Sequence, residues 1–317
     1  MALNALAALS IAHAAGLAGD GARAVDLGNQ RLSVSSDALL RIADHKESRG
    51  QNEAAGALRE LARKPDSERR PLSHAFYAAL GFSEYVAIDV NEKFGSIPMD
   101  LNSPLRRTYG YEEEFELVVN NGTGEHIFDQ RAVFENMHNL CAKDGLMLHI
   151  IPFAGFLNHG FYNIQPTLYL DLSAANDYRI EALGIGNATG ALGFMAGSAA
   201  DGLLEAQNIP RELLVRPIEG RAPWGKPPLR WLRIALYERG YYNDPRMNLD
   251  RAVLKVMRDS QRETGKVFGN VLMVALLRKT GTADFKVPFQ GRFVPNLEDE
   301  TIASNYEKSS ISGALSQ

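Results

Sequence analysis

Apolar residues along the chain fall into short continuous runs, separated by stretches with helical spacing. Short apolar runs are typical of strands that are buried on both faces of a sheet. We expect such strands at 22–27, 84–89, 115–119, 146–151, 178–183 and 269–278. Helical patterns predict an amphipathic helix at 1–18 and further helices at 35–64, 71–80 and 166–175. Strands that alternate with helices predict a parallel sheet with right-handed crossovers, and therefore an α/β fold.

The clearest helical pattern begins after Asp129, which can cap a helix. Gly145 stands where a glycine commonly follows the end of a helix. His138 falls on the polar side of this helix and is expected in solvent, whereas His149 lies within the next strand and is expected in the core. The apolar side is formed by Val133, Phe134, Met137, Leu140 and Cys141.

Length and patterning favour a single domain that spans residues 1–317. Within it, 1–80 is interpreted as a helical lid region around the first strand, and 184–266 as an insertion that forms a cap or a dimer surface. The net charge of −4 gives no sign of a nucleic-acid or membrane partner, so we expect a small-molecule substrate and leave a homodimer open. The single cysteine, and a start without the basic residues of a signal peptide, favour the cytoplasm.

Ligands of parallel sheets bind beyond the carboxyl ends of the strands, so the residues that follow each strand are the candidates for a site. Asp89 ends the second strand and can accept both ribose hydroxyls of an adenosine, although a solvated or helix-capping aspartate would look the same. Asp100 could accept the amine of an adenine. Gly28, after the first strand, lets the backbone approach a ligand, but a strand-to-helix turn is the simpler explanation.

The loops after the fourth and fifth strands are rich in polar and aromatic side chains. The first begins with Asn120-Asn121-Gly122 and continues to His126. Because buried amides must be paired, a ligand is a natural partner for two consecutive asparagines, and Asx turns are the alternative. The second loop, at 152–166, contains four aromatic residues, and its His159 is a candidate general base. No set of His, Cys, Asp and Glu has the spacing of metal ligands, so no metal is expected.

These elements resemble those of bacterial class I S-adenosylmethionine (SAM)-dependent methyltransferase-like proteins. The segment 120–128 is similar to a Gly-Thr-x-Glu-His element of that family, and 158–166 is similar to a His-Gly-Phe-Tyr element. The resemblance covers roughly residues 22–178 and the late strand near Asn270. The chain departs from the family in its first glycine motif, which keeps only Asp26 and Gly28.

The resemblance implies a Rossmann-like class I methyltransferase fold, with a mostly parallel seven-stranded sheet, helices on both faces and a final antiparallel pair of strands. It also implies SAM as the cofactor. The candidate catalytic residues are His159 and His126 as bases and Tyr162, whose ring could face the sulfonium. The residues expected to bind the cofactor are Asp26, Gly28, Gln30, Asp89, Asp100, Leu101, Asn120, Asn121 and Gly122.

The sequence is compatible with three functions. The first is methyl transfer from SAM to a small-molecule acceptor. The second uses SAM at another carbon, by cyclisation to azetidine-2-carboxylate or by aminocarboxypropyl transfer, and releases methylthioadenosine. The third is a SAM-fold binding module without catalysis. The products formed from SAM would separate the three.

Overall fold

The computed structural model describes residues 2–71, 73–187, 192–196 and 270–290. The strands are β1 (Ala2–Leu3), β2 (Arg23–Leu27), β3 (Arg31–Leu32), β4 (Glu84–Asp89), β5 (Ile97–Pro98), β6 (Phe115–Asn121), β7 (Cys141–Ala154), β8 (Tyr178–Gly186), β9 (Leu192–Ala196) and β10 (Val271–Lys279). The helices are α1 (Ala5–Ala18), α2 (Ser36–Ser48), α3 (Asn52–Arg63), α4 (Asp66–Arg69), α5 (Ser73–Ala79), α6 (Leu105–Tyr109), α7 (Gln130–Leu140) and α8 (Pro166–Asn176).

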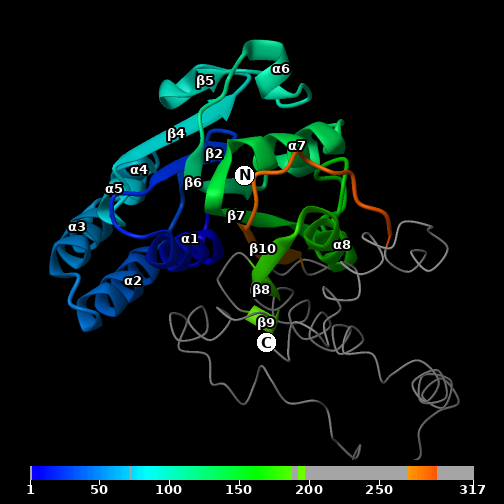
Figure 1. The fold of residues 1–317 in the computed structure, drawn as a ribbon. Coiled ribbons are helices and arrows are strands. Elements are labelled where there is room, and N and C mark those ends of the chain that lie inside the picture. The colour runs from blue at the N-terminus through cyan, green and yellow to red at the C-terminus, as the bar shows by residue number, and fades with distance from the viewer. Residues whose placement is uncertain (1, 72, 188–191, 197–269, 291–317) are drawn as a thin grey trace, which may run out of the picture.

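In the described part of the chain, the main sheet has eight strands in the order β5-β4-β2-β6-β7-β10-β8-β9 (Figure 1). The pairs among β5, β4, β2, β6 and β7 are all parallel, whereas β10 lies antiparallel between β7 and β8. This confirms the predicted Rossmann-like class I methyltransferase fold with a late antiparallel strand. The sheet has one strand more than predicted, because β9 pairs with β8 at the edge.

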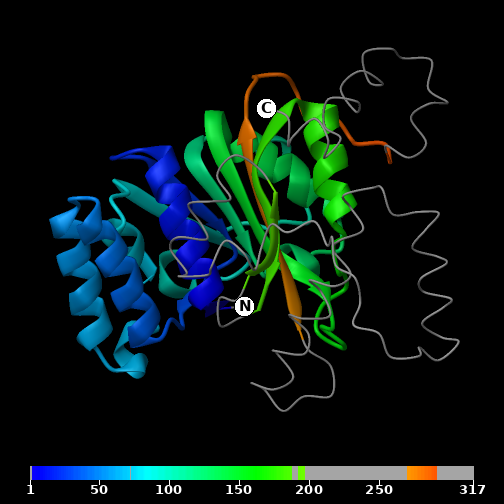
Figure 2. The same ribbon diagram turned by 90° about the horizontal axis from the view of Figure 1, so that it is seen from below.

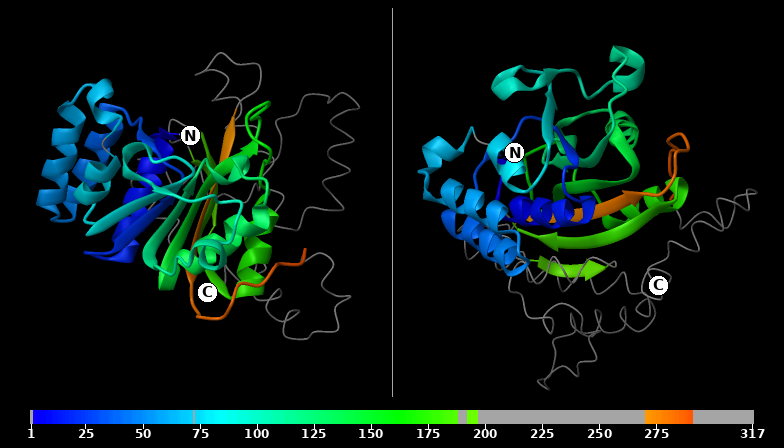
Figure 3. Two further views of the ribbon diagram at one scale, coloured as in Figure 1. Left: turned by 90° about the horizontal axis from the view of Figure 1, so that it is seen from above. Right: turned by 60° about the vertical axis from the view of Figure 1, so that its left-hand side comes forward.

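Helices cover both faces of the sheet, as predicted (Figure 2, Figure 3). Helices α1, α2, α3 and α5 share one apolar cluster with Leu117 of β6 and Leu148 of β7. Helices α7 and α8 share a second cluster with Val118 and Met147 from the same two strands. Neighbouring strand residues point to opposite faces, so a strand that is covered on both sides must be apolar throughout.

Helix α1 is buried on more sides than an amphipathic helix would be. The Asn4 side chain caps it by accepting a hydrogen bond from the Ala7 amide at 3.0 Å. The helix contacts β6 and β7 on one side and α2 on another, so apolar residues around most of its circumference are buried. The stretch 35–64, which was predicted to be helical, forms two helices, α2 and α3. The chain turns between them at Gly50, which has a φ of 77°. These helices account for the long connection between β2 and β4.

The structure corrects two predictions made around α7. Gly145 does not cap the helix, which ends at Leu140; it lies in β7, where a Cβ would come within 2.9 Å of the Ala142 carbonyl oxygen. His138 is not in solvent but buried, with Nδ1 2.6 Å from the Tyr178 hydroxyl. The partners of His138 come from β8 and from the segment after β10, which the spacing within one helix does not reveal.

The predicted insertion at 184–266 falls mostly outside the described residues. Its first residues belong to β8, which continues to Gly186, and the described residues 192–196 form β9. Among the described residues, no helix combines the length and apolar character that crossing a membrane requires.

Candidate functional site

The order of strands reverses between β2 and β6, and the loops that follow these strands meet there. Gly28 follows β2 with a φ of 85°, and its amide donates to the Ile88 carbonyl at 2.6 Å. A Cβ on Gly28 would collide with the Thr123 side chain in the loop after β6. A glycine is therefore needed here because the backbone comes close to another group, but that group is the Thr123 side chain and not the expected ligand.

Gln30 joins the same two loops from a buried position. Its Nε2 donates to the Asn121 carbonyl at 2.9 Å and to Thr123 Oγ1 at 3.2 Å, and its Oε1 accepts from Asn121 Nδ2 at 3.3 Å. Asn121 Oδ1 is buried and has no hydrogen-bond partner among the described residues. Gly122 follows with a φ of 64°, which turns the chain away from β6. A buried amide oxygen without a donor is therefore left beside the switch in strand order.

Asn120 has a different role from its neighbour, although both were predicted to contact the cofactor. The two asparagines end β6 rather than beginning a loop, so their side chains point to opposite faces of the sheet. Asn120 Oδ1 accepts from the Gly124 amide at 2.9 Å, which fixes the 3₁₀ helix Gly124–His126. Asn120 thus holds its own loop, whereas Asn121 keeps a free acceptor.

Asp89 lies at the carboxyl end of β4, as predicted, and holds two loops. Its Oδ2 accepts from the Asn29 amide at 2.8 Å, and its Oδ1 accepts from Asn91 Nδ2 at 2.6 Å. Asp100 Oδ1 accepts from the Asn102 amide at 2.9 Å. Leu101, between them, is buried in the apolar cluster under α7. The acids after β4 and β5 therefore stand at the same edge of the sheet as the loops after β2 and β6.

Asp26 is not placed with these residues. Its carboxyl is completely buried within the sheet and accepts from the Tyr77 hydroxyl at 2.6 Å and the Tyr85 hydroxyl at 2.8 Å. Burial raises the pKa of this carboxyl to about 7, although the two hydroxyl donors act in the opposite direction. Because its side chain is occupied by tyrosines from α5 and β4, we leave Asp26 out of the candidate site.

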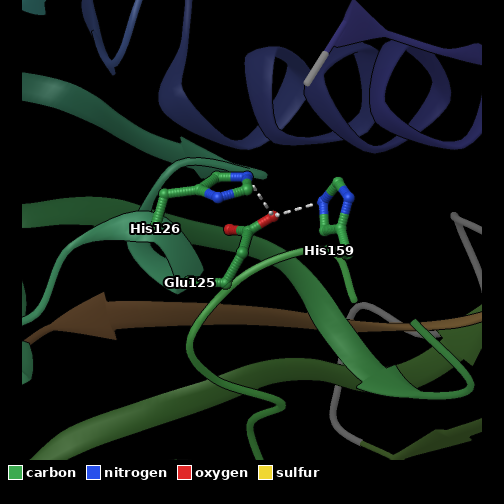
Figure 4. Close-up of side chains that lie close together, drawn as sticks. All are labelled: Glu125, His126 and His159. Atoms are coloured by element: carbon green, nitrogen blue, oxygen red, sulfur yellow. Dashed lines mark ion pairs between the residues drawn. The ribbon is translucent and has the colours of Figure 1, made fainter. Parts of the chain in front are cut away.

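The loops after β6 and β7 bring three side chains together (Figure 4). Glu125 lies between two imidazoles, with Oε1 3.7 Å from His126 Nε2 and 3.5 Å from His159 Nε2. The rings of the two histidines are 4.9 Å apart, centroid to centroid. Glu125 is fully buried, whereas the histidine side chains are 41% and 35% exposed. The carboxylate of the cluster is therefore buried, whereas its two imidazoles are accessible from solvent.

Backbone contacts fix the distance between these two loops. The Glu125 carbonyl accepts from the amides of Phe161 at 2.8 Å and Tyr162 at 3.3 Å. Gly160 makes this approach possible, because a Cβ there would lie 2.9 Å from Glu125 Cγ. The half-buried Tyr162 also donates from its hydroxyl to the Phe128 carbonyl at 3.0 Å, so it ties the two loops together.

Burial dominates the electrostatics of the cluster. Neither carboxylate oxygen of Glu125 has a hydrogen-bond partner among the described residues, and burial raises the pKa of this carboxyl to about 7. Burial also lowers the pKa of His126, and the neighbouring His159 adds to that effect. Both histidines were predicted as site residues from the sequence, but Glu125 was not. The sequence shows only that Glu125 directly precedes His126; its approach to His159 appears only in the fold.

Comparisons with known proteins give structural likeness only. No family model matches the chain, and no curated protein sequence matches it. One similar structure is the O-methyltransferase from the trans-AT PKS multienzyme of Brevibacillus brevis in complex with S-adenosyl-L-homocysteine, with 12% identity, a TM-score of 0.35, and coverage of 97% of this chain and 77% of that chain. A second is StiE O-MT residues 961–1257, with 11% identity, a TM-score of 0.30, and coverage of 90% and 73%. A third is a putative sarcosine dimethylglycine methyltransferase from Galdieria sulphuraria, with 11% identity, a TM-score of 0.25, and coverage of 86% and 84%.

Proposed function

We propose that the protein is a SAM-dependent methyltransferase that acts on a small molecule. One observation carries the proposal: the sheet has a class I methyltransferase strand order, and polar side chains gather at the carboxyl edge around its switch point. Ligands of open α/β sheets bind at this place. Asp89 and Asn121 are the two side chains there with the chemistry to hold the two ends of SAM.

Asp89 suits the nucleoside end of the cofactor. It stands at the end of β4, and its Oδ2 accepts one hydrogen bond, from the Asn29 amide. A carboxylate oxygen can accept two hydrogen bonds, so the contacts among the described residues leave one position on Oδ2 for a ribose hydroxyl. The second hydroxyl would take the position that the Asn91 side-chain amide now occupies on Oδ1.

Asn121 suits the methionine end. Its Oδ1 is buried and has no donor in the described part of the chain, and the ammonium group of SAM would supply one. The Glu125 cluster would then lie toward the acceptor. His159 is our candidate for the base that takes a proton from an acceptor hydroxyl, and His126 is second. The Glu125 carboxylate, 3.5 Å from His159 Nε2, would favour the protonated imidazole that results.

Methyl transfer itself needs little chemistry from the protein. The step is an in-line displacement at the sulfonium methyl, so alignment of the acceptor oxygen with the S–CH₃ bond supplies most of the acceleration. The acceptor gains the methyl group, SAM becomes S-adenosylhomocysteine, and the acceptor's proton passes to the base.

Product analysis tests the proposal directly. The protein is incubated with SAM alone and with a panel of small hydroxyl, amine and carboxylate acceptors, and the products are identified by mass spectrometry. We expect S-adenosylhomocysteine that depends on an acceptor. Methylthioadenosine would instead mean that SAM reacts at another carbon, and tight SAM binding without any product would favour a binding module.

Calorimetry with SAM tests the placement of the cofactor. Asp89→Ala should weaken SAM binding about 10- to 100-fold, since the second hydroxyl only replaces the Asn91 amide and the net gain is one hydrogen bond to a charged group, about 1.5–3 kcal/mol. The matched control is Asp20→Ala, an exposed aspartate that precedes β2 at the opposite edge of the sheet. An Asp89→Ala dissociation constant equal to that of wild type would show that the cofactor lies elsewhere.

A further inference from the structure

We infer that Glu125, His126 and His159 form a binding site for one divalent transition-metal ion of the zinc type. The three residues offer one carboxylate oxygen and two imidazole nitrogens that all lie within 4.8 Å of one another. Two of them are adjacent in the chain, and the third comes from the next strand-end loop, so spacing along the sequence predicted no metal. Metal binding by these residues does not depend on the proposed methyl transfer.

The two distances from the Glu125 carboxylate to the imidazoles are close to those in a coordination sphere. Ligands at about 2.1 Å from a tetrahedral zinc ion are about 3.4 Å from one another. In the structure, Glu125 Oε1 lies 3.5 Å from His159 Nε2 and 3.7 Å from His126 Nε2. These separations are too long for hydrogen bonds, but a small inward movement of each side chain would place an ion between the three atoms.

The Glu125 carboxylate supplies the second, independent observation. It is fully buried, both oxygens lack a hydrogen-bond partner among the described residues, and Oε1 faces the imidazoles (Figure 4). Buried charges in proteins are paired or coordinate metals, because an unpaired buried carboxylate is costly. A bound cation would remove that cost.

The donor set selects the class of metal. Imidazole nitrogen suits zinc, cobalt, nickel and iron, whereas Mg²⁺ and Ca²⁺ prefer oxygen ligands throughout. Three protein ligands leave a fourth position open, as in catalytic zinc sites. That position faces solvent, because the two histidine side chains are 41% and 35% exposed while Glu125 is buried on the protein side of the cluster.

A metal would change how the proposed reaction handles its proton. With a metal bound, Glu125, His126 and His159 would hold it, so both imidazoles would be ligands rather than bases. The metal would lower the pKa of a bound water, which could then take the proton of an acceptor hydroxyl, while the methyl group passes from SAM to the acceptor oxygen and S-adenosylhomocysteine is released. This consequence rests on the proposed function, whereas binding of the metal does not.

The test is metal titration of the full chain without an affinity tag, after removal of metal by a chelator and without SAM. Co²⁺ is the spectroscopic probe, since its visible absorption reports tetrahedral or five-coordinate binding, and Zn²⁺ is then titrated in competition. We expect one equivalent of Co²⁺, displaced by Zn²⁺ and not by Mg²⁺. His126→Ala, His159→Ala and Glu125→Gln should each weaken binding at least about 10-fold.

His74→Asn is the matched control, because this exposed histidine of α5 is not part of the cluster. It should bind Co²⁺ as wild type does. Glu125→Gln keeps the shape of the side chain and removes its charge, so a folded variant that no longer binds metal would support the site. Wild-type binding in all three cluster variants, an equal loss in His74→Asn, or no Co²⁺ spectrum in the wild type would overturn the inference. None of these outcomes bears on whether SAM is bound.

Discussion

At the scale of single residues, the site depends on glycines, which have no side chain, as much as on its polar side chains. Gly28 and Gly160 each allow one loop to contact the next, and a Cβ at either position would enter a neighbouring side chain. Gly28 could be identified from the sequence as a place for close approach. That Thr123 fills the space is not visible in the sequence, because this contact crosses from one strand end to another.

The same limit explains Glu125. From the sequence, His126 and His159 could be named as candidates, because a histidine at a strand end is chemically conspicuous. That the Glu125 carboxylate lies between them depends on the register of β6 against β7, which pairs Asn120 with His149 and Asn121 with Ile150. This register arises from the packing of the whole sheet and not from any local pattern.

Gly160→Ala tests how closely the two loops must approach. The added methyl group would lie 2.9 Å from both Glu125 Cγ and the Glu125 carbonyl oxygen, so the loop after β7 must move away. We expect Co²⁺ binding to weaken about 10-fold or more while the protein stays folded, since His159 moves out of reach. Gly281→Ala is the control, because no atom of the described residues lies within 4 Å of its added Cβ. Equal Co²⁺ binding by both variants would show that the loop tolerates the shift.

At the scale of elements, continuous apolar runs predicted the inner strands well. The run at 84–89 is β4 with the same bounds, and 115–119 is β6, which continues for two residues into the asparagine pair. Helix α7 begins after its Asp129 cap as predicted, since capping is a local interaction: the Asp129 side chain accepts from the Ala132 amide at 3.0 Å. The end of α7 was predicted wrongly, because the chain passes directly from Leu140 into β7 at Cys141, and the positive φ of 62° falls on Asp144 within β7 rather than on a glycine that caps the helix.

Two glycines in different elements should respond in opposite ways to the same substitution. Gly56 is exposed in α3, and none of the described residues comes within 4 Å of an added Cβ, so Gly56→Ala should stabilise the protein by about 0.5–1 kcal/mol through helix propensity. At Gly145 in β7, a Cβ would lie 2.9 Å from the Ala142 carbonyl oxygen and 3.0 Å from Cys141 Sγ. Gly145→Ala should therefore destabilise the protein by about 1–3 kcal/mol. Urea unfolding of both variants measures the difference, and a shift of the same sign in both would contradict it.

At the scale of the whole molecule, buried ionisable groups set how stability depends on pH. Burial lowers the pKa of His13 and His138 to about 4 and that of His149 to about 3. These histidines take up protons on unfolding, so between about pH 4 and 6.5 they make the protein more stable as the pH rises. Asp26 and Glu125 act in the opposite sense, because burial raises the pKa of each to about 7.

Asp26→Asn isolates the contribution of one buried carboxyl to the pH dependence of stability. The wild-type carboxyl has a pKa of about 7 when folded and an ordinary value of 3.8, so the native state binds the proton more tightly. Its contribution to stability is greatest below about pH 4 and falls as the pH rises to about 7. Asparagine does not titrate, and its amide can still pair with the hydroxyls of Tyr77 and Tyr85. Relative to its parent, the variant should therefore gain about 2 kcal/mol in unfolding free energy between about pH 5.5 and pH 8.

The measurement is urea unfolding at both pH values, with a chelator present and in a Glu125→Gln background, so that the second buried carboxyl does not titrate. The histidine contributions are common to parent and variant and cancel in the comparison. If the gain from pH 5.5 to pH 8 is absent, Asp26 is ionised in the folded protein throughout this range. In that case the two tyrosine hydroxyls, which favour the charged form, outweigh the burial of the carboxyl at the centre of the sheet.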